Sequence, residues 1–320
     1  MKAPRFLQLD HSDPAALRAE LIHGLCTVAS SIAPKYFYDA LGARLFSAIT
    51  ELPEYYPTRT EAAIFARHGE EMATALRAMG GAPVWVDLGA GNCEKAARLF
   101  DRFEVQRYVA VDIAVDYLAQ ALEHLQRRYP TMDLLGIGMD FSRQIALPAE
   151  IGDGPRLIFY PGSSIGNFDP VESLRFLRQA HRAAKGGALL IGVDLVKPTA
   201  ILESAYDDPL GVTAAFNRNL LLHVNRLIGS DFRLADWRHV ASYNAPASRI
   251  EMHLEATRNC TVRWTDGERH YFAGQRIHTE NSYKWRIEDF AGLLAQAGFT
   301  GVRPWADERG WFAVFLASAG

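Results

Sequence analysis

Residues 84–95 read VWVDLGAGNCEK, and this stretch decides the fold of the chain. It opens with five mainly apolar residues, as expected for a short buried strand. Gly89 and Gly91 then allow a tight turn and let a ligand approach the backbone closely. A helix is expected to follow, so the stretch predicts a strand–turn–helix unit at a binding site.

The same alternation continues downstream. Short apolar runs that resemble buried strands occupy residues 108–111, 134–139, 157–160 and 188–193. Amphipathic helices are expected between them, notably over 115–129 and 171–184. Five buried strands separated by helices predict βαβ units and a mostly parallel sheet. The fold class is therefore α/β, with a Rossmann-like sheet.

The C-terminal segment predicts a different edge for this sheet. A helix is expected over residues 287–297, and two strands should follow it at 301–305 and 311–316. The turn between those strands is tight, so they should add an antiparallel edge to the parallel sheet.

Two regions do not fit the alternation and predict a second domain of α+β type. Residues 1–60 are expected to be helical or irregular, and residues 197–286 interrupt the core before its last helix. We assign 61–196 with 287–320 to the core domain, and 1–60 with 197–286 to an inserted accessory domain.

Composition restricts the classes of function. The 320 residues carry a formal net charge of −3, which gives no basic surface for nucleic acid. No apolar run is long enough to span a membrane, and no signal-peptide core follows the N-terminus. The three cysteines are far apart and the histidines lack metal-ligand spacing, so no disulfide or metal site is expected. We expect a cytoplasmic protein, with a monomer as the working hypothesis and without a nucleic-acid or membrane partner.

The glycine turn predicts a cofactor that contains adenosine. Asp112 lies 112 − 91 = 21 residues beyond Gly91, at the end of the next strand, where a carboxylate can accept both ribose hydroxyls. Glu94 stands where a dinucleotide fingerprint needs a small residue, and its charge disfavours a pyrophosphate and hence a dehydrogenase. S-adenosylmethionine is cationic and tolerates this acid. Asp140 and Phe141, after the third strand, suit its adenine; the alternative is a turn without a ligand.

A polar segment follows the fourth strand, at the crevice edge where substrates of open α/β sheets bind. Within residues 161–168, PGSSIGNF, Asn167 can donate and accept hydrogen bonds, which suits an amino acid's carboxylate and amine. The alternative is that Asn167 caps the helix that starts near Pro170. For the tyrosines near residues 36–56, the alternative is that they only pack against other aromatic rings. For the polar run 277–285, the alternative is a turn exposed to solvent.

Four separated motifs carry a resemblance to a known family. They are LPEYYPTR at 52–59, GSSIGN at 162–167, AYDDPLGVTAAFNRN at 205–219 and HTENSYKW at 278–285. Over most of the chain, from about Pro34 to the C-terminus, the sequence resembles the histidine-specific methyltransferases, which include the L-histidine Nα-methyltransferases of ergothioneine biosynthesis. The resemblance implies a class I methyltransferase sheet with a second domain that binds the amino acid.

The resemblance also implies roles for individual residues. The positions that match the family's S-adenosylmethionine site are Tyr38, Gly89, Lys95, Asp112, Asp140 and Phe141. Asn167 and Tyr206 match residues that hold the amino acid's carboxylate and amine. The positions that match the imidazole pocket are Tyr55, Glu280 and Ser282. We expect Asn167 and Tyr38 to be the catalytic residues, and three successive methylations of the histidine α-amine to give hercynine.

Other functions remain open at this stage. The same chemistry on tryptophan, a histidine derivative or a peptide terminus is the nearest alternative. Aminopropyl transfer to a polyamine would need an acidic substrate channel, for which Asp207 and Asp208 are the visible candidates. A non-catalytic S-adenosylmethionine-binding regulator is the third, although the polar residues of the matched pocket are all present.

Overall fold

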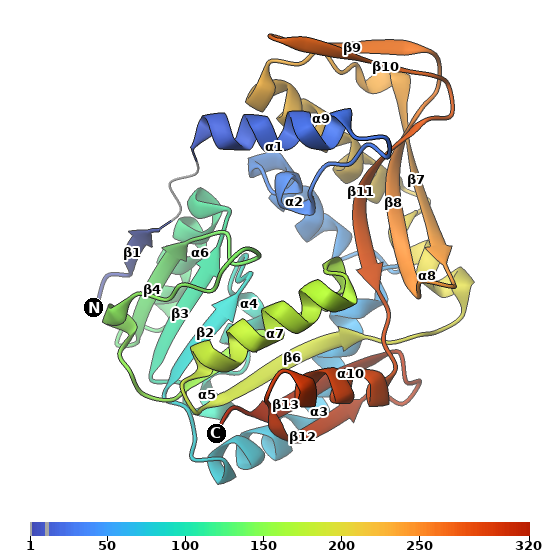
Figure 1. Cartoon of the computed structure of the whole chain (residues 1–320). Coiled ribbons are helices and arrows are strands. Elements are labelled where there is room, and N and C mark those ends of the chain that lie inside the picture. Colours follow the sequence, from blue (N-terminus) through green and yellow to red (C-terminus); the bar gives the residue numbers. More distant parts are fainter. Residues whose placement is uncertain (1, 10–12) are drawn as a thin grey trace. The chain divides into compact units, whose positions relative to one another are not determined.

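The computed structural model describes residues 2–9 and 13–320 and divides the chain into two compact units. The first unit comprises Met1–Asp10, Pro57–Val196 and Lys284–Gly320, and the second comprises His11–Tyr56 and Lys197–Tyr283. Each unit thus combines segments that are distant in sequence (Figure 1). Among the described residues, no helix has the length and apolar character needed to cross a membrane.

An eight-stranded sheet forms the centre of the first unit (Figure 1). Its strand order is β1-β4-β3-β2-β5-β6-β13-β12. The strands are β1 (Arg5–Gln8), β2 (Val84–Leu88), β3 (Arg107–Asp112), β4 (Asp133–Gly138), β5 (Arg156–Tyr160), β6 (Ala188–Asp194), β12 (Thr300–Ala306) and β13 (Phe312–Ser318). The pairs from β1 to β6 are parallel, and β13 pairs antiparallel with both β6 and β12. The predicted Rossmann-like sheet with an antiparallel C-terminal edge is confirmed.

Helices cover both faces of this sheet, because alternate strand residues enter two separate cores. The unit's helices are α3 (Tyr56–Ala78), α4 (Glu94–Ala97), α5 (Phe100–Phe103), α6 (Val115–Arg128), α7 (Pro170–Ala184) and α10 (Ile287–Gln296), with short 3-10 turns η2 (Ala149–Ile151) and η3 (Ser164–Asn167). Trp85 and Tyr108 pack with α3, α5 and α6, whereas their neighbours Val86 and Val109 pack with α7 and α10. Burial on both faces explains the continuous apolar runs in the sequence.

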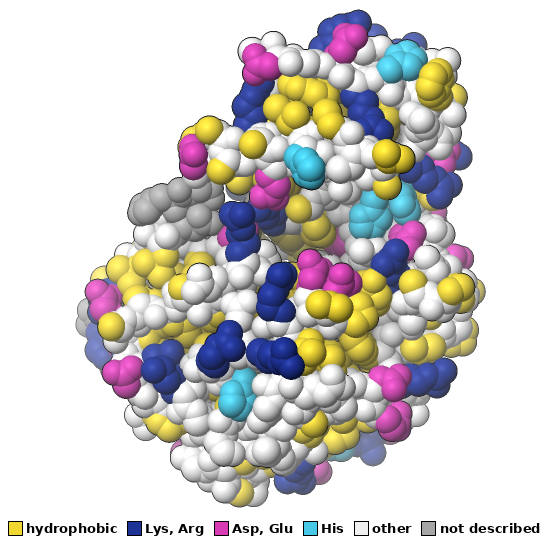
Figure 2. Space-filling model, in the orientation of Figure 1, with side chains coloured by type: hydrophobic (Ala, Val, Ile, Leu, Met, Phe, Trp, Pro, Cys, Tyr) yellow, Lys and Arg dark blue, Asp and Glu magenta, His cyan; other side chains and the backbone are white. Residues whose placement is uncertain are grey.

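Helix α7 shows how the amphipathic pattern becomes structure. Phe176, Leu177 and Ala180 are buried in the second core. Arg175 and Arg178 are exposed on the opposite side, and Figure 2 shows Lys and Arg side chains gathered where this helix lies in Figure 1. The spacing of three and four residues between the apolar side chains places them on one helical face.

The N-terminal strand contradicts the expectation that residues 1–60 are helical or irregular and belong to the accessory domain. β1 pairs with β4 in parallel and extends the sheet of the first unit. The pairing depends on glycines in β4, because a Cβ on Gly136 would lie 2.5 Å from Phe6 and one on Gly138 would lie 2.2 Å from Gln8. Four residues with one alternation carry too little pattern to predict an edge strand whose partner is more than a hundred residues away.

The second unit contains helices and two small antiparallel sheets. Its helices are α1 (Pro14–Cys26), α2 (Ala40–Ile49), α8 (Thr199–Tyr206) and α9 (Val212–Ile228), with 3-10 turns η1 (Pro34–Phe37) and η4 (Leu234–Asp236). Its strands are β7 (Trp237–Asn244), β8 (Arg249–Ala256), β9 (Cys260–Trp264), β10 (Gly267–Tyr271) and β11 (Arg276–Tyr283). The sheets have the orders β11-β8-β7 and β10-β9. Helix α9 packs on α1, α2 and the three-stranded sheet.

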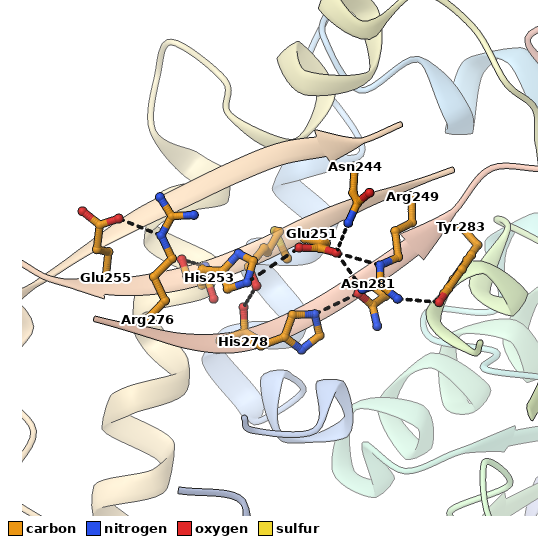
Figure 3. A network of polar contacts seen from close by, with 12 residues as sticks. Asn244, Arg249, Glu251, His253, Glu255, Arg276, His278, Asn281 and Tyr283 are labelled. Carbon is orange, nitrogen blue, oxygen red and sulfur yellow. Dashed lines mark hydrogen bonds and ion pairs between the residues drawn. The ribbon is translucent and has the colours of Figure 1, made fainter. Parts of the chain in front are cut away.

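One face of the three-stranded sheet carries a network of polar side chains (Figure 3). Glu251 accepts hydrogen bonds from Asn244 at 2.9 Å and from Arg249 at 2.8 Å, and it lies 3.9 Å from the ring of His253. The His253 and His278 rings are in edge contact at 5.2 Å. Burial, together with the neighbouring His278, lowers the pKa of His253 to about 4, and burial also lowers the pKa of His278.

We expect His253 to make the free energy of unfolding depend on pH. Between pH 6.5 and 4 the unfolded chain binds a proton at His253 that the folded chain excludes, so stability is lost as the pH falls through this window. His253 contributes roughly 3 kcal/mol to the loss. Denaturant unfolding from pH 7 to pH 4 should show that His253→Gln flattens the profile. The same substitution at exposed His124 is the control; an unchanged profile for His253→Gln would show that folding does not shift the pKa of His253.

Candidate functional site

The glycine turn after β2 has the backbone geometry that the sequence predicts. Gly89 and Gly91 have φ values of 75° and 53°, and Cys93 also has a positive φ of 61°. The backbone N–H groups of Gly89 and Ala90 both donate to the carbonyl of Val111, at 2.8 and 3.1 Å. The turn therefore lies across the end of β3, the neighbouring strand.

Asp112, at the end of β3, holds this turn through its carboxylate. One oxygen accepts from the N–H of Gly91 at 2.8 Å and the other accepts from the N–H of Ala114 at 2.9 Å. Burial raises the pKa of Asp112, while these N–H groups oppose the shift because they favour the charged form. Each carboxylate oxygen has a second lone pair, so the group can hold the turn and still accept hydrogen bonds from ligand hydroxyls.

Asp140 and Phe141 follow β4, on the other side of β3. Asp140 accepts a hydrogen bond from the N–H of Ser142 at 3.1 Å. The ring of Phe141 lies against the glycine turn, since a Cβ added to Gly89 would be 3.5 Å from its Cζ. Four of the predicted cofactor residues, Gly89, Asp112, Asp140 and Phe141, therefore follow the carboxyl ends of three adjacent strands, where open α/β sheets bind ligands.

Lys95 stands in the short helix α4 after the turn, and its partner was not predicted from the sequence. Its ammonium group donates to Glu61 of α3 at 2.8 Å, and the Glu61 side chain is only 1% exposed. Glu61 immediately follows the LPEYYPTRT run, but an isolated acid in an amphipathic helix usually faces solvent.

Asp87 is a second buried acid that the sequence analysis did not assign. The Tyr108 hydroxyl donates to one of its oxygens at 2.6 Å, and its other oxygen has no hydrogen-bond partner among the described residues. Burial raises the pKa of Asp87 to about 7, although the Tyr108 hydrogen bond opposes the shift. Asp87 lies two residues before Gly89 in the sequence. This position was the signal by which a role at the cofactor turn could have been predicted.

Asn167 ends η3, in the loop between β5 and α7. The predicted alternative, that it caps α7, is wrong because Asp169 is the N-cap and forms a capping box with Glu172. The Asp169 carboxylate accepts from the N–H of Glu172 at 2.8 Å, and Glu172 accepts from the N–H of Asp169 at 3.1 Å. Asn167 is half-buried, and its side chain makes no hydrogen bond within the part of the chain that the structure describes.

The second unit holds four of the five residues matched to the amino-acid pocket, and the fifth, Asn167, lies in the first unit. The Tyr206 hydroxyl, at the end of α8, donates to Ser282 of β11 at 2.7 Å, and both side chains are buried. Glu280 is two residues from Ser282 on the same strand, so both side chains lie on one face, and Glu280 is 8% exposed. The ring of Tyr55 contacts the ring of Tyr206 at 6.4 Å. Tyr55, Tyr206, Glu280 and Ser282 thus form one cluster, which we call the tyrosine–glutamate cluster.

Two side chains beside this cluster explain how Tyr206 is held. His239 hydrogen-bonds the carbonyl of Tyr206 through Nε2 at 2.8 Å, and its Nδ1 lies 2.8 Å from the amide of Asn217. The ring is neutral in this arrangement, with the proton on Nε2, and burial lowers the pKa of His239. Asn217 belongs to the AYDDPLGVTAAFNRN motif, so part of that motif serves to position Tyr206.

Tyr38 follows η1 in the same unit. Its ring meets the edges of Phe46 at 5.8 Å and Phe216 at 6.0 Å. Phe46 in turn contacts Tyr55 at 6.3 Å, so Tyr38 borders the tyrosine–glutamate cluster through one shared phenylalanine. Aromatic packing, considered as the alternative for these tyrosines, describes part of their contacts. The predicted residues therefore form two groups, one in each unit.

Comparison with known proteins identifies the family of this chain. A model of the family "histidine-specific methyltransferase, SAM-dependent" matches residues 17–319, nearly the whole chain. The chain belongs to this family. It is 40% identical over 309 residues to a histidine N-alpha-methyltransferase of Mycolicibacterium smegmatis, covering 94% of each chain. It is also 40% identical over 311 residues to the protein of the same name from Mycobacterium tuberculosis, covering 95% of each.

A more distant relative is named for a different substrate. The chain is 26% identical over 264 residues to a 4-dimethylallyltryptophan N-methyltransferase of Claviceps purpurea, covering 75% of this chain and 76% of that protein. Membership makes this chain an S-adenosylmethionine-dependent methyltransferase, an enzyme that acts on a small molecule.

The residues around the glycine turn fit S-adenosylmethionine. A Cβ on Gly91 would meet no atom within 4 Å, so the backbone there is open to a ligand. Asp87 and Asp112 place two acidic side chains around the turn, and one buried oxygen of Asp87 has no hydrogen-bond partner among the described residues; the third acid, Glu61, is paired with Lys95. Such a site favours a cation over the phosphates of a dinucleotide.

Proposed function

We propose that this enzyme methylates the α-amine of free L-histidine, three times in succession, to give the trimethylated betaine hercynine. The observation that carries the proposal is the tyrosine–glutamate cluster, in which a buried carboxylate lies beside a Tyr206–Ser282 hydrogen bond. A buried acid suits a ring with N–H donors, and histidine supplies one. The two relatives at 40% identity are named histidine N-alpha-methyltransferases, and a fungal relative named for ergothioneine biosynthesis supports the same pathway.

We assign the substrate contacts as follows. Glu280 and Ser282 take the imidazole, with Tyr55 against its face. Tyr206 and Asn167 hold the carboxylate and the amine. On the cofactor side, Gly89 and Asp112 receive the ribose end, Asp140 and Phe141 the adenine, and Lys95 and Tyr38 complete the site. The Asn167 amide has no hydrogen bond among the described residues, which leaves its donor and acceptor for substrate.

In methyl transfer, the main role of this chain's residues is to position the amine and the methyl donor. When bound, S-adenosylmethionine supplies an activated methyl group that a neutral amine displaces in line. Charge is transferred rather than created, so no strong general acid is required. Asn167 and the Tyr38 hydroxyl align the amine lone pair by accepting hydrogen bonds from its N–H groups. Holding two reactants in line contributes about 7–11 kcal/mol to lowering such barriers.

Mass spectrometry of products tests the proposal. The enzyme is incubated with S-adenosylmethionine and a mixture of the twenty amino acids. We expect histidine alone to gain the mass of one, two and finally three methyl groups. Modification of tryptophan in preference to histidine would support the alternative that the Claviceps relative suggests, and the absence of any methylated product would refute both.

The proposal also covers the setting of the enzyme. Cys26, Cys93 and Cys260 are free thiols, which suits a reducing cytoplasm. We propose that the enzyme works there as a monomer on its amino-acid substrate, without a nucleic-acid or membrane partner. Gel filtration across a range of concentrations tests the monomer.

Two neighbouring substitutions should separate catalysis from folding. Asn167→Ala is expected to lower kcat about ten- to a hundredfold, the cost of one hydrogen bond to the reacting amine. Its melting temperature should barely change, because Asn167 makes no hydrogen bond among the described residues. Asp169→Ala should remove about 1 kcal/mol of stability through loss of the α7 cap, with kcat preserved. The reverse pattern would show that Asn167 is structural.

A further inference from the structure

Glu61 contacts two loops of the first unit with one carboxylate. Its Oε2 accepts a hydrogen bond from the Lys95 ammonium at 2.8 Å, and its Oε1 accepts one from the backbone N–H of Gly162 at 2.7 Å. Lys95 lies directly after the glycine turn, whereas Gly162 begins the GSSIGN loop that carries Asn167. The carboxylate therefore links the loop after β2, which is assigned to the cofactor, to the loop after β5, which carries Asn167.

The surroundings of Glu61 are shaped to hold this carboxylate. A Cβ on Gly192 of β6 would lie 2.0 Å from Oε1, so the glutamate fits only because β6 has a glycine there. A Cβ on Gly162 would lie 2.9 Å from Nζ of Lys95, which places the ammonium against the start of the GSSIGN loop. The three groups thus meet at one point in the unit.

Burying the Glu61 carboxylate costs desolvation free energy, which its ion pair does not necessarily recover. Stability alone therefore does not explain the arrangement. The Glu61 side chain is 1% exposed and that of Lys95 is 37% exposed, and replacing an ion pair with a buried member by apolar side chains often leaves stability unchanged or raises it. The GSSIGN loop has a second attachment one residue later, where the N–H of Asp194 donates to the Ser163 hydroxyl at 2.8 Å. Two adjacent residues, Gly162 and Ser163, are therefore fixed in the loop that carries Asn167, whose amide makes no hydrogen bond among the described residues.

We propose that Glu61 is a positioning residue for methyl transfer, which sets Lys95 with one oxygen and the Asn167 loop with the other. The inference rests on the proposed roles of Lys95 in cofactor binding and Asn167 in substrate alignment. Glu61 itself touches neither reactant. Its two oxygens have separable effects: the Lys95 contact acts on cofactor affinity, and the Gly162 contact acts on turnover.

Three substitutions separate the two contacts. Glu61→Gln keeps an acceptor for Gly162 but turns an amide toward Lys95, so we expect S-adenosylmethionine binding to weaken about tenfold while kcat at saturating cofactor changes little. Gly192→Ala displaces the oxygen that faces Gly162, so kcat should fall about tenfold with cofactor affinity nearly kept. Glu61→Leu removes both contacts and should lose both properties. Calorimetry with S-adenosylmethionine and steady-state kinetics measure the two effects on folded protein.

Matched controls exclude general damage. Glu70→Gln changes an exposed glutamate on the same helix, which pairs with Arg102, and Gly292→Ala adds a methyl group with no atom of the described residues within 4 Å apart from its own helix backbone and chain neighbours. Both should behave as wild type. Thermal unfolding monitors the fold of every variant. Loss of melting temperature in Glu61→Gln and Gly192→Ala, with unchanged affinity and kcat in the folded protein, would overturn the positioning role.

A further variant distinguishes failure of this inference from failure of the underlying assignment. Lys95→Met should weaken S-adenosylmethionine binding, and adding Glu61→Gln to it should cause no further loss, because the two residues act through one contact. Unchanged affinity in Lys95→Met would refute the role of Lys95. Weakened affinity in Lys95→Met with independent, additive loss from Glu61→Gln would refute the coupling alone.

Discussion

Replacing Glu280 by alanine is expected to weaken histidine binding by about 2–4 kcal/mol while S-adenosylmethionine affinity barely changes. Glu280 is buried on β11, on the same face as Ser282, whose hydroxyl is already engaged by Tyr206. In the proposed complex the carboxylate accepts the imidazole N–H in a site that excludes water. Its removal leaves that N–H without a partner, and the affinity for histidine falls.

Calorimetric titration of histidine in the presence of S-adenosylhomocysteine measures this effect. Glu280→Gln is the informative partner, because the amide oxygen keeps a neutral acceptor and should retain part of the affinity. Glu255→Ala is the matched control: this buried glutamate lies on neighbouring β8 but pairs with Arg238 and Arg276. Histidine affinity that stays at the wild-type value in Glu280→Ala would remove the imidazole pocket from the proposal.

The loss of Asp112 should have the largest effect on the cofactor. Asp112→Ala removes the acceptor for the N–H groups of Gly91 and Ala114 together with the acceptor for the ribose hydroxyls. Hydrogen bonds to a charged group contribute about 1.5–3 kcal/mol each, so S-adenosylmethionine affinity should fall a hundredfold or more. Asp112→Asn, which keeps one carbonyl acceptor, should lie between Asp112→Ala and wild type.

Binding of S-adenosylmethionine followed by calorimetry tests this prediction. Exposed Asp116, in the first turn of α6, is the control, since alanine there should cost only the small helix-dipole contribution. A lower melting temperature in Asp112→Ala combined with wild-type cofactor affinity would mean that the carboxylate holds the turn and does nothing for the ligand.

The parts of this molecule that could be predicted are those with a local or periodic signal. The order of strands and helices over 84–193 and 287–316 follows from apolar runs and turn residues, and the position of Asp112 follows from its distance to Gly91. The α7 cap was also decidable in principle, because Asp169, Pro170 and Glu172 form a capping-box pattern that competes with Asn167. Asp169 and Asn167 are both near the start of α7, and Asp169, which directly precedes Pro170, is the N-cap.

Other features depend on contacts between distant segments. β1 is too short to be recognised, and it forms because β4 offers an edge with glycines beneath Phe6 and Gln8. Residues 197–286 carry no local signal for which strands pair, and pairing of β8 with β7 and β11 required closure of loops of different length. Sequence patterns carry no information on which edge a short strand will find.

The sequence by itself determined the class of fold, the cofactor turn and the family. These depend on glycines, strand ends and long motifs, which are recognised from residues that are close together in the sequence. Only the tertiary structure decided that Glu61 is buried, that one carboxylate holds both Lys95 and Gly162, and that Tyr206 meets Ser282. The physical reason is that a side chain's burial and partners depend on what packs against it. A glutamate in a helix looks the same in sequence whether water or a glycine of a distant strand lies opposite.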